Sequence, residues 1–177
     1  MNENFSVSPD GQKFPLPTSD QYPKEFERIK NIVKKQRELG REIVVVMGVG
    51  FVGAVMAAII ADTIDKQTGK PNKFVIGMQR PSVRSYWKIP LLNQGISPVK
   101  AEDPEVDPMI KRCVLEKKTL IATYTYEVLS LADVVVVDEA SMVDIALMSK
   151  LIQAVPKNAR LILICLLYTS DAADELD

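Results

Sequence analysis

The segment IVVVMGVGFVGAVMAAIIA, residues 43–61, has the strongest structural signal in the sequence. Its first five residues are apolar and mostly β-branched, which is typical of a buried strand in a parallel sheet. Gly48, Gly50 and Gly53 follow with the spacing G-x-G-x-x-G, and the alanine-rich stretch after them favours a helix. The segment therefore predicts a strand, a glycine turn and a helix in series.

Hydropathy alone allows a second interpretation of residues 43–61, because none of them is charged. Such a run is long enough to cross a membrane, and the basic side chains at 34, 35, 37 and 41 resemble a cytoplasmic flank. A strand, a turn and a short buried helix reach the same mean hydropathy, and three closely spaced glycines interrupt a span. We therefore expect no membrane segment.

The composition excludes several kinds of chemistry. The chain has 177 residues and a net charge of -1, so it has no basic field to attract nucleic acid. Histidine is absent, which excludes Ser-His-Asp and Cys-His catalytic sets and histidine-based zinc sites. Two cysteines are too few for a disulfide framework and favour a reducing cytoplasmic setting. We expect no metal site and no nucleic-acid partner; the oligomeric state stays open.

Strands alternate with helices along the chain. The first 23 residues contain four prolines and lack a secretory signal pattern, so they predict an extended arm that is either disordered or lies over the domain surface. Residues 81–103, with Pro90 and Pro98, are expected to be irregular. Helices are predicted at 23–39, 51–64, from 104 onward and at 142–155, with one or two turns at 126–132. Predicted strands cover 43–47, 74–77, 120–124, 134–137 and 161–166. This alternation predicts an incomplete doubly wound parallel α/β sheet of the Rossmann-like class.

The glycine motif predicts a phosphate-binding turn for a dinucleotide. Gly48 allows a tight turn, Gly50 lets a pyrophosphate approach the backbone, and Gly53 lets the helix pack closely on the strand. The N-terminus of the helix, which begins with Phe51 and Val52, supplies free N–H groups and a partial positive charge. We expect these five residues to bind the cofactor.

The end of the second strand does not decide which dinucleotide binds. An NAD site commonly has Asp or Glu there for the ribose hydroxyls, whereas this strand ends in GMQR, residues 77–80. Arg80 could meet a 2′-phosphate, stack on adenine or remain a solvated arginine, and Gln79 could bond the ribose. We include Arg80 among the cofactor-binding residues and expect NAD, with NADP open.

Residues 43–138 resemble the N-terminal NAD-binding domain of nucleotide-sugar dehydrogenases, the UDP-glucose and GDP-mannose dehydrogenase family. The resemblance rests on VVVMGVGFVGAVMA, FVIGMQRPS, LLNQGISPVKAEDPEV and ADVVVVD. Within the third stretch, Ser97, Pro98, Asp103 and Pro104 match the family's loop before a helix. The resemblance implies oxidation of a sugar C6 alcohol to a carboxylate with two NAD, on a nucleotide-sugar substrate.

No catalytic residue transfers from this family to the chain. The family's cysteine nucleophile and its Lys, Asn and Asp partners come from later parts of the fold, which this sequence does not contain. Cys113 does not match that cysteine, and its place on an apolar helical face predicts a buried core thiol. We therefore expect dinucleotide binding without turnover.

The stretch DEASMVDIALMSKLIQAVPKNARLILI, residues 138–164, resembles a different protein class. It is similar to the Walker B region of superfamily-1 helicases, closest to the alpha subunit of exodeoxyribonuclease V. The resemblance implies that Asp138 lies near Mg²⁺ and that Glu139 orients the attacking water. The partner loop G-x-x-x-x-G-K-[ST] is missing, because Gly69-Lys70 is followed by Pro71. We expect an acidic strand-to-helix turn here, with an ATPase fragment as the alternative.

The last thirteen residues, CLLYTSDAADELD at 165–177, resemble a translated sequencing adapter. Two unrelated motif neighbourhoods also meet at VVVVD, a string that suits either. These observations suggest a chimera with an arm and helix at 1–40, a partial dinucleotide-binding domain at 41–138, a helicase-like fragment at 139–164 and an artefactual tail.

Resequencing tests the chimera hypothesis. Amplification of the source DNA across codons 130–145 is expected to give no continuous product, because the two parents would not be adjacent in the genome. A continuous native read would contradict the hypothesis.

Overall fold

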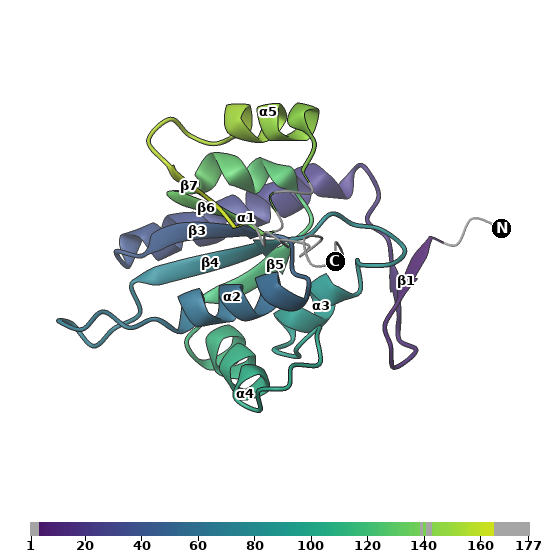
Figure 1. The fold of residues 1–177 in the computed structure, drawn as a ribbon, viewed down its shortest axis with the longest axis horizontal. Helices are drawn as coiled ribbons and strands as arrows, with labels where there is room; N and C mark the ends of the chain where they lie inside the picture. Colours follow the sequence, from purple (N-terminus) through teal and green to yellow (C-terminus); the bar gives the residue numbers. More distant parts are fainter. Residues whose placement is uncertain (1–3, 139, 141–142, 165–177) are drawn as a thin grey trace, which may run out of the picture.

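A computed structural model describes residues 4–138, 140 and 143–164 of the chain, and its centre is a parallel sheet (Figure 1). The strands lie in the order β5-β4-β3-β6-β7. Counted along the chain, this order is third, second, first, fourth, fifth, which is that of doubly wound dinucleotide-binding folds. The predicted fold class is confirmed. The bounds are β3 (Glu42–Met47), β4 (Lys73–Met78), β5 (Leu120–Thr123), β6 (Val134–Val137) and β7 (Arg160–Leu163).

Helices cover both faces of the sheet, as Figure 1 shows. Val44 and Val46 of β3 face one core and Ile43 and Val45 face the other, because successive strand residues point to opposite sides. One face packs against α2 (Phe51–Asp62), α3 (Lys88–Asn93), α4 (Val106–Lys111) and the π-helical turn η1 (Arg112–Glu116). The other packs against α1 (Gln21–Glu38), the 3₁₀ turn η2 (Tyr126–Leu131) and α5 (Ile145–Ala154).

The apolar segment 43–61 divides as its glycines predict. Strand β3 ends at Met47 and helix α2 begins at Phe51, so the run changes from extended to helical at the glycine turn. In the part of the chain that the structure describes, no helix is both long and apolar enough to cross a bilayer. The predicted helix 51–64 ends earlier, at Asp62.

The N-terminal segment lies against the domain, as one of the two alternatives predicts, but it is a β-hairpin rather than an extended arm. It forms a β-hairpin of β1 (Phe5–Val7) and β2 (Lys13–Pro15), which turns at Gly11 with a φ of 83°. The buried Ser6 hydroxyl donates to the Val83 carbonyl at 2.8 Å and accepts from the Trp87 N–H at 3.1 Å. The hairpin therefore packs on the segment that follows β4.

Two further boundaries differ from the predictions. Residues 81–103 contain helix α3, whereas the sequence analysis predicts an irregular segment because of Pro90 and Pro98. Pro90 lies in the first turn of α3, where its missing N–H breaks no helical bond. Strand β7 ends at Leu163, short of the predicted 166, and residues 165–166 lie outside the described part.

The β5 edge of the sheet is closed by a side chain. Asn93 accepts a hydrogen bond from the Ala122 N–H at 2.7 Å and donates one to the Ala122 carbonyl at 2.9 Å. The carboxamide thus pairs with the backbone of a fully buried residue as a neighbouring strand would. An unpaired buried N–H would be destabilising, so Asn93 stabilises this edge.

Replacing Asn93 tests this edge contact. Asn93→Ala is expected to lower the free energy of unfolding by about 1–3 kcal/mol, because it leaves the buried Ala122 N–H without a partner. Urea denaturation measures the change. Gln94→Ala is the matched control, since Gln94 is exposed at the end of the same helix. Equal stability of the two variants would contradict a role for Asn93.

Candidate functional site

The glycine turn connects β3 to α2 at the carboxyl end of the sheet. Gly48 has a φ of 90°, a conformation that favours glycine, and its N–H donates to the Met78 carbonyl at 2.8 Å. Gly50 caps α2 with extended backbone, and a Cβ there would meet no atom within 4 Å. At Gly53 a Cβ would overlap the carbonyl oxygen of Gly48. The three glycines therefore serve the turn, the open approach and the close packing that the sequence predicts.

Helix α2 presents unpaired donors beside this open approach. The first intrahelical bond runs from the Ala54 N–H to the Gly50 carbonyl at 3.1 Å, and no side chain caps the helix. Within the described ranges, the N–H groups of Phe51, Val52 and Gly53 therefore have no hydrogen-bond partner. No acidic side chain lies in the first turn. A helix end of this kind favours an anion, through its N–H groups and the helix dipole.

The turn lies at the point where the strand order reverses. Strand β3 has β4 on one side and β6 on the other, and the chain builds outward from β3 in both directions. In open parallel sheets, ligands bind outside the carboxyl ends of the strands at such a switch point. The exposed side chains of Phe51 and Val52 form the apolar border of the turn.

Gln79 holds the turn in place, a role that the sequence analysis missed. Its side-chain oxygen accepts a hydrogen bond from the Val49 N–H at 3.0 Å, and the backbone N–H of Gln79 donates to the Thr123 carbonyl at 3.0 Å. A Cβ at Gly77 would come within 2.6 Å of the Val49 side chain, so a glycine in β4 makes room for the turn. A polar residue directly after the second strand was the only sequence signal for this contact.

Arg80 follows Gln79 and is exposed. Its side chain makes no hydrogen bond or ion pair with any residue that the structure describes, while its carbonyl accepts from the Ser85 hydroxyl at 3.0 Å. No carboxylate follows β4, in agreement with the sequence. Arg80 is thus the neighbour in sequence of Gln79, whose side chain contacts the glycine turn.

Asp138 enters the same region from the end of β6. Its Oδ2 atom lies 3.7 Å from the position that a Cβ would take at Gly53. A carboxylate is therefore close to the N-terminus of α2, which is the arrangement that the alternative Mg²⁺ role of Asp138 requires. Glu139, the predicted water-orienting residue, lies outside the described residues.

The predicted core thiol is confirmed. The Cys113 side chain is fully buried, and its thiol lies 3.6 Å from the Ala58 carbonyl and 3.5 Å from an Asp62 oxygen. Burial and the Asp62 carboxylate raise the pKa of this thiol to about 11, so it remains protonated near neutral pH. Asp62 is itself bound by Arg112 and Lys117, which lower the pKa of its carboxyl far below the usual value. Cys113 is thus unsuited to act as a nucleophile.

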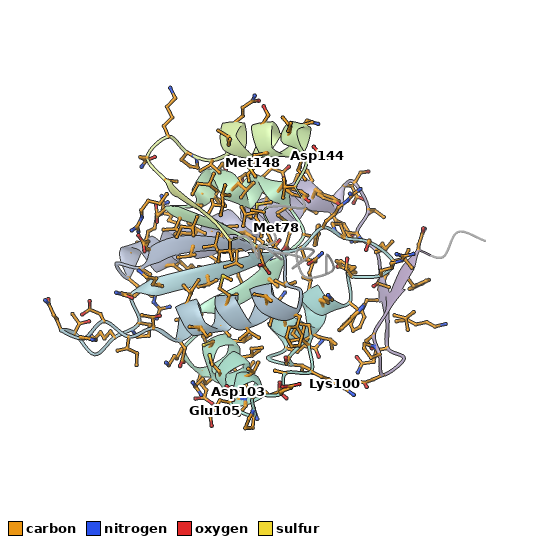
Figure 2. All side chains as sticks on the ribbon, viewed as in Figure 1. Met78, Lys100, Asp103, Glu105, Asp144 and Met148 are labelled. Carbon is orange, nitrogen blue, oxygen red and sulfur yellow. The ribbon has the colours of Figure 1, made fainter. Side chains whose placement is uncertain are left out.

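The loop before α4, which is part of the resemblance to the dehydrogenases, lies away from the glycine turn. Asp103 accepts a hydrogen bond from the Glu105 N–H at 2.9 Å and begins the turn before α4. Figure 2 shows Asp103 and Glu105 beside α4, far from Met78 at the end of β4. No three His, Cys, Asp or Glu side chains in the described ranges lie close enough together to hold a metal ion.

A comparison with protein families identifies the chain's family. A family model described as AAA domain matches residues 31–165, which include the glycine turn, Asp138 and all five strands of the sheet. The chain belongs to the AAA domain family. The matched range extends to both sides of residue 138. This AAA domain nonetheless lacks a lysine in the turn between its first sheet strand and the following helix.

The solved structures similar to this AAA domain include three nucleotide-sugar dehydrogenases. An NDP-N-acetyl-D-galactosaminuronic acid dehydrogenase from Methanosarcina mazei Go1 is 25% identical, with a TM-score of 0.55, over 76% of the chain. UDP-D-ManNAc dehydrogenase from Pyrococcus horikoshii is 21% identical over 68%, with a TM-score of 0.48. GDP-mannose dehydrogenase from Pseudomonas aeruginosa is 19% identical over 70%, with a TM-score of 0.49. The latter two are too distant to support an inference.

The AAA domain chain spans only part of these dehydrogenases. It covers 30% of the Methanosarcina protein, 28% of the Pyrococcus protein and 28% of the Pseudomonas protein. No curated protein sequence matches the chain.

The close packing at Gly53 gives a direct test of the turn. Gly53→Ala is expected to lower the free energy of unfolding by about 1–3 kcal/mol or more, because its Cβ would overlap the Gly48 carbonyl. Gly50→Ala is the control, since a Cβ there meets no neighbour and the residue has a φ of -75°. Urea denaturation compares the two variants. Equal stability of Gly53→Ala and wild type would show that α2 is not held this closely against β3.

Proposed function

We propose that the chain binds a nicotinamide adenine dinucleotide, NAD or its 2′-phosphorylated form NADP, as part of a nucleotide-sugar dehydrogenase. The observation that carries the proposal is the uncapped N-terminus of α2 beside the open Gly50. Both lie at the switch point of the sheet, whose strands β5-β4-β3-β6-β7 have the order 3-2-1-4-5 when counted along the chain. Free N–H groups, the helix dipole and a residue without a side chain suit a pyrophosphate at this position.

Each site residue has a separate task in this proposal. The N–H groups of Phe51, Val52 and Gly53 bind the pyrophosphate, and Gly50 leaves room for it. Gly48 turns the chain so that these groups point outward. Arg80 lies at the adenosine end of the dinucleotide, where a 2′-phosphate would meet its guanidinium. The bound nicotinamide would accept hydride, whereas this chain supplies binding and orientation.

The similarity to the Methanosarcina dehydrogenase supports the class of reaction. That protein has a TM-score of 0.55 and 25% identity to the chain, and its name assigns it to nucleotide-sugar oxidation. Because the chain spans 30% of it, substrate binding and turnover would need further parts of a longer protein. Cys113 is buried, so we assign no catalytic residue within residues 4–138.

A second candidate function is binding of ATP with Mg²⁺. Membership of the AAA domain family favours it, and so does the Asp138 carboxylate near the N-terminus of α2. A phosphate-binding loop for ATP usually adds a lysine that reaches the β- and γ-phosphates, and residues 48–53 contain none. For that reason we prefer the dinucleotide.

The division of the chain into 41–138 and 139–164 remains a proposal. Residues 160–163 form β7, which pairs in parallel with β6, so the second segment completes the same sheet as the first. Both segments would then contribute to one dinucleotide-binding fold, whether or not they share an origin.

Ligand titration tests the proposed function. Calorimetric titration of the whole chain with NAD or NADP is expected to show binding, which Gly50→Val weakens by roughly tenfold or more because a branched side chain would occupy the pyrophosphate position. Lys66→Ala is the control, since Lys66 is exposed in the loop before β4, at the amino end of the strands and so at the opposite end from the glycine turn.

Two results would contradict the dinucleotide proposal. One is binding of ATP with Mg²⁺ but of neither dinucleotide, which would favour the second candidate. The other is unchanged dinucleotide affinity of a folded Gly50→Val variant. Urea denaturation of that variant separates a lost site from a lost fold.

A further inference from the structure

We infer that the dinucleotide bound here has a 2′-phosphate and that Arg80, in the segment after β4, binds this phosphate. The inference rests on the proposed function and specifies its ligand as NADP rather than NAD. In this fold the residues after the second strand of the sheet contact the adenosine ribose, and β4 is that strand. An acid there selects the ribose hydroxyls of NAD, whereas an arginine accommodates a 2′-phosphate.

No carboxylate is available to select NAD. The chain has no Asp or Glu between Asp65 and Glu102, a stretch that includes β4 and everything up to the turn before α4. Gln79, the other polar residue at the end of β4, uses its side-chain oxygen for the Val49 N–H at 3.0 Å. One of the two acceptor sites of this oxygen is therefore already used to hold the glycine turn.

An acid from another element, Glu25 of α1, lies near the end of β4 and is already paired with a cation. Glu25 of α1 accepts a hydrogen bond from the Thr123 hydroxyl at 2.7 Å, next to the end of β4. Both of its oxygens also bond to Arg28, at 2.7 and 2.8 Å. Its charge is compensated by an arginine, so it would neither bind a ribose hydroxyl freely nor strongly repel a phosphate.

The segment 80–87 instead offers two cationic side chains. Arg80 and Arg84 are both exposed, and neither guanidinium has a partner among the residues that the structure describes. The hydroxyls of Ser82 and Ser85 lie 2.7 Å apart, and the Ser85 hydroxyl donates to the Arg80 carbonyl at 3.0 Å. Guanidinium groups bind phosphate oxygens through charge-assisted and often bidentate hydrogen bonds, whereas the two serine hydroxyls are already bonded within the segment.

This segment is held in one conformation before any ligand binds. Its own turns bond the Ser85 and Tyr86 N–H groups to the Ser82 carbonyl, at 3.1 and 3.0 Å. The buried Ser6 of the N-terminal hairpin bonds both the Val83 carbonyl and the Trp87 N–H. A preformed loop loses little conformational entropy on binding, which favours a specific anion site over a chance arginine.

Paired titrations with NAD and NADP test the inference. Wild-type chain is expected to bind NADP more tightly than NAD. Arg80→Ala should weaken NADP binding by roughly tenfold to a hundredfold and change NAD binding less than about twofold, because only NADP contacts the guanidinium through its 2′-phosphate. Arg80→Lys keeps the charge and should restore part of the NADP affinity. Lys66→Ala removes one exposed positive charge at the amino end of the strands, and it should change the affinity for neither dinucleotide.

The outcomes distinguish the two proposals. NAD binding equal to or tighter than NADP binding would overturn the inference and leave the dinucleotide function intact. An equal loss of both ligands in Arg80→Ala would also overturn it, and would indicate stacking of Arg80 on adenine. Binding of neither dinucleotide by the folded wild-type chain would overturn the proposed function together with the inference. Circular dichroism of each variant establishes that it is folded.

Discussion

The packing of Gly53 against the carbonyl of Gly48 is the constraint on which the site depends. Because no Cβ separates them, α2 begins directly over the end of β3. The N–H groups of Phe51, Val52 and Gly53 are then open at the carboxyl edge of the sheet. A larger residue at position 53 would move the helix away from the strand and would change the direction of these donors.

Contacts from the neighbouring strands support this turn. The Met78 carbonyl accepts from Gly48, Gln79 accepts from Val49, and Gly77 leaves the space that Val49 fills. Each contact comes from β4 or from the residue directly after it. The position of the turn and the position of the segment after β4 are therefore coupled. The N-terminal hairpin extends this support, since Ser6 holds the Val83 and Trp87 backbone.

The same region has features of two nucleotide-binding classes. A buried strand, a glycine turn and a helix N-terminus serve phosphates in both, and an acid after a neighbouring strand is typical of an ATPase. The sheet order and the absence of a lysine in the turn separate them, because they favour a pyrophosphate bound by backbone N–H groups alone. Membership of the AAA domain family and structural similarity to a dehydrogenase are therefore compatible at the level of the strand-turn-helix unit.

The elements whose residues carry a strong local signal could be predicted from the amino-acid sequence alone. The β-branched run before Gly48, the glycine spacing and the alanine-rich helix gave the strand, turn and helix, and the five strands follow from short apolar runs. Cys113 was placed in the core by the apolar face around it. These predictions succeeded because the physical cause lies within a few residues of the feature.

Features that depend on residues far apart in the chain became apparent only in the folded structure. The hairpin that contains Ser6 gains its stability from Val83 and Trp87, about eighty residues away, so local sequence gives no signal for it. The sequence allowed Gln79 as a ribose ligand, but the pairing of β3 with β4 brings its side-chain oxygen to the backbone N–H of Val49. The 3-2-1-4-5 order, and with it the switch point beside Gly50, likewise arises from strand pairing and crossovers rather than from any single motif.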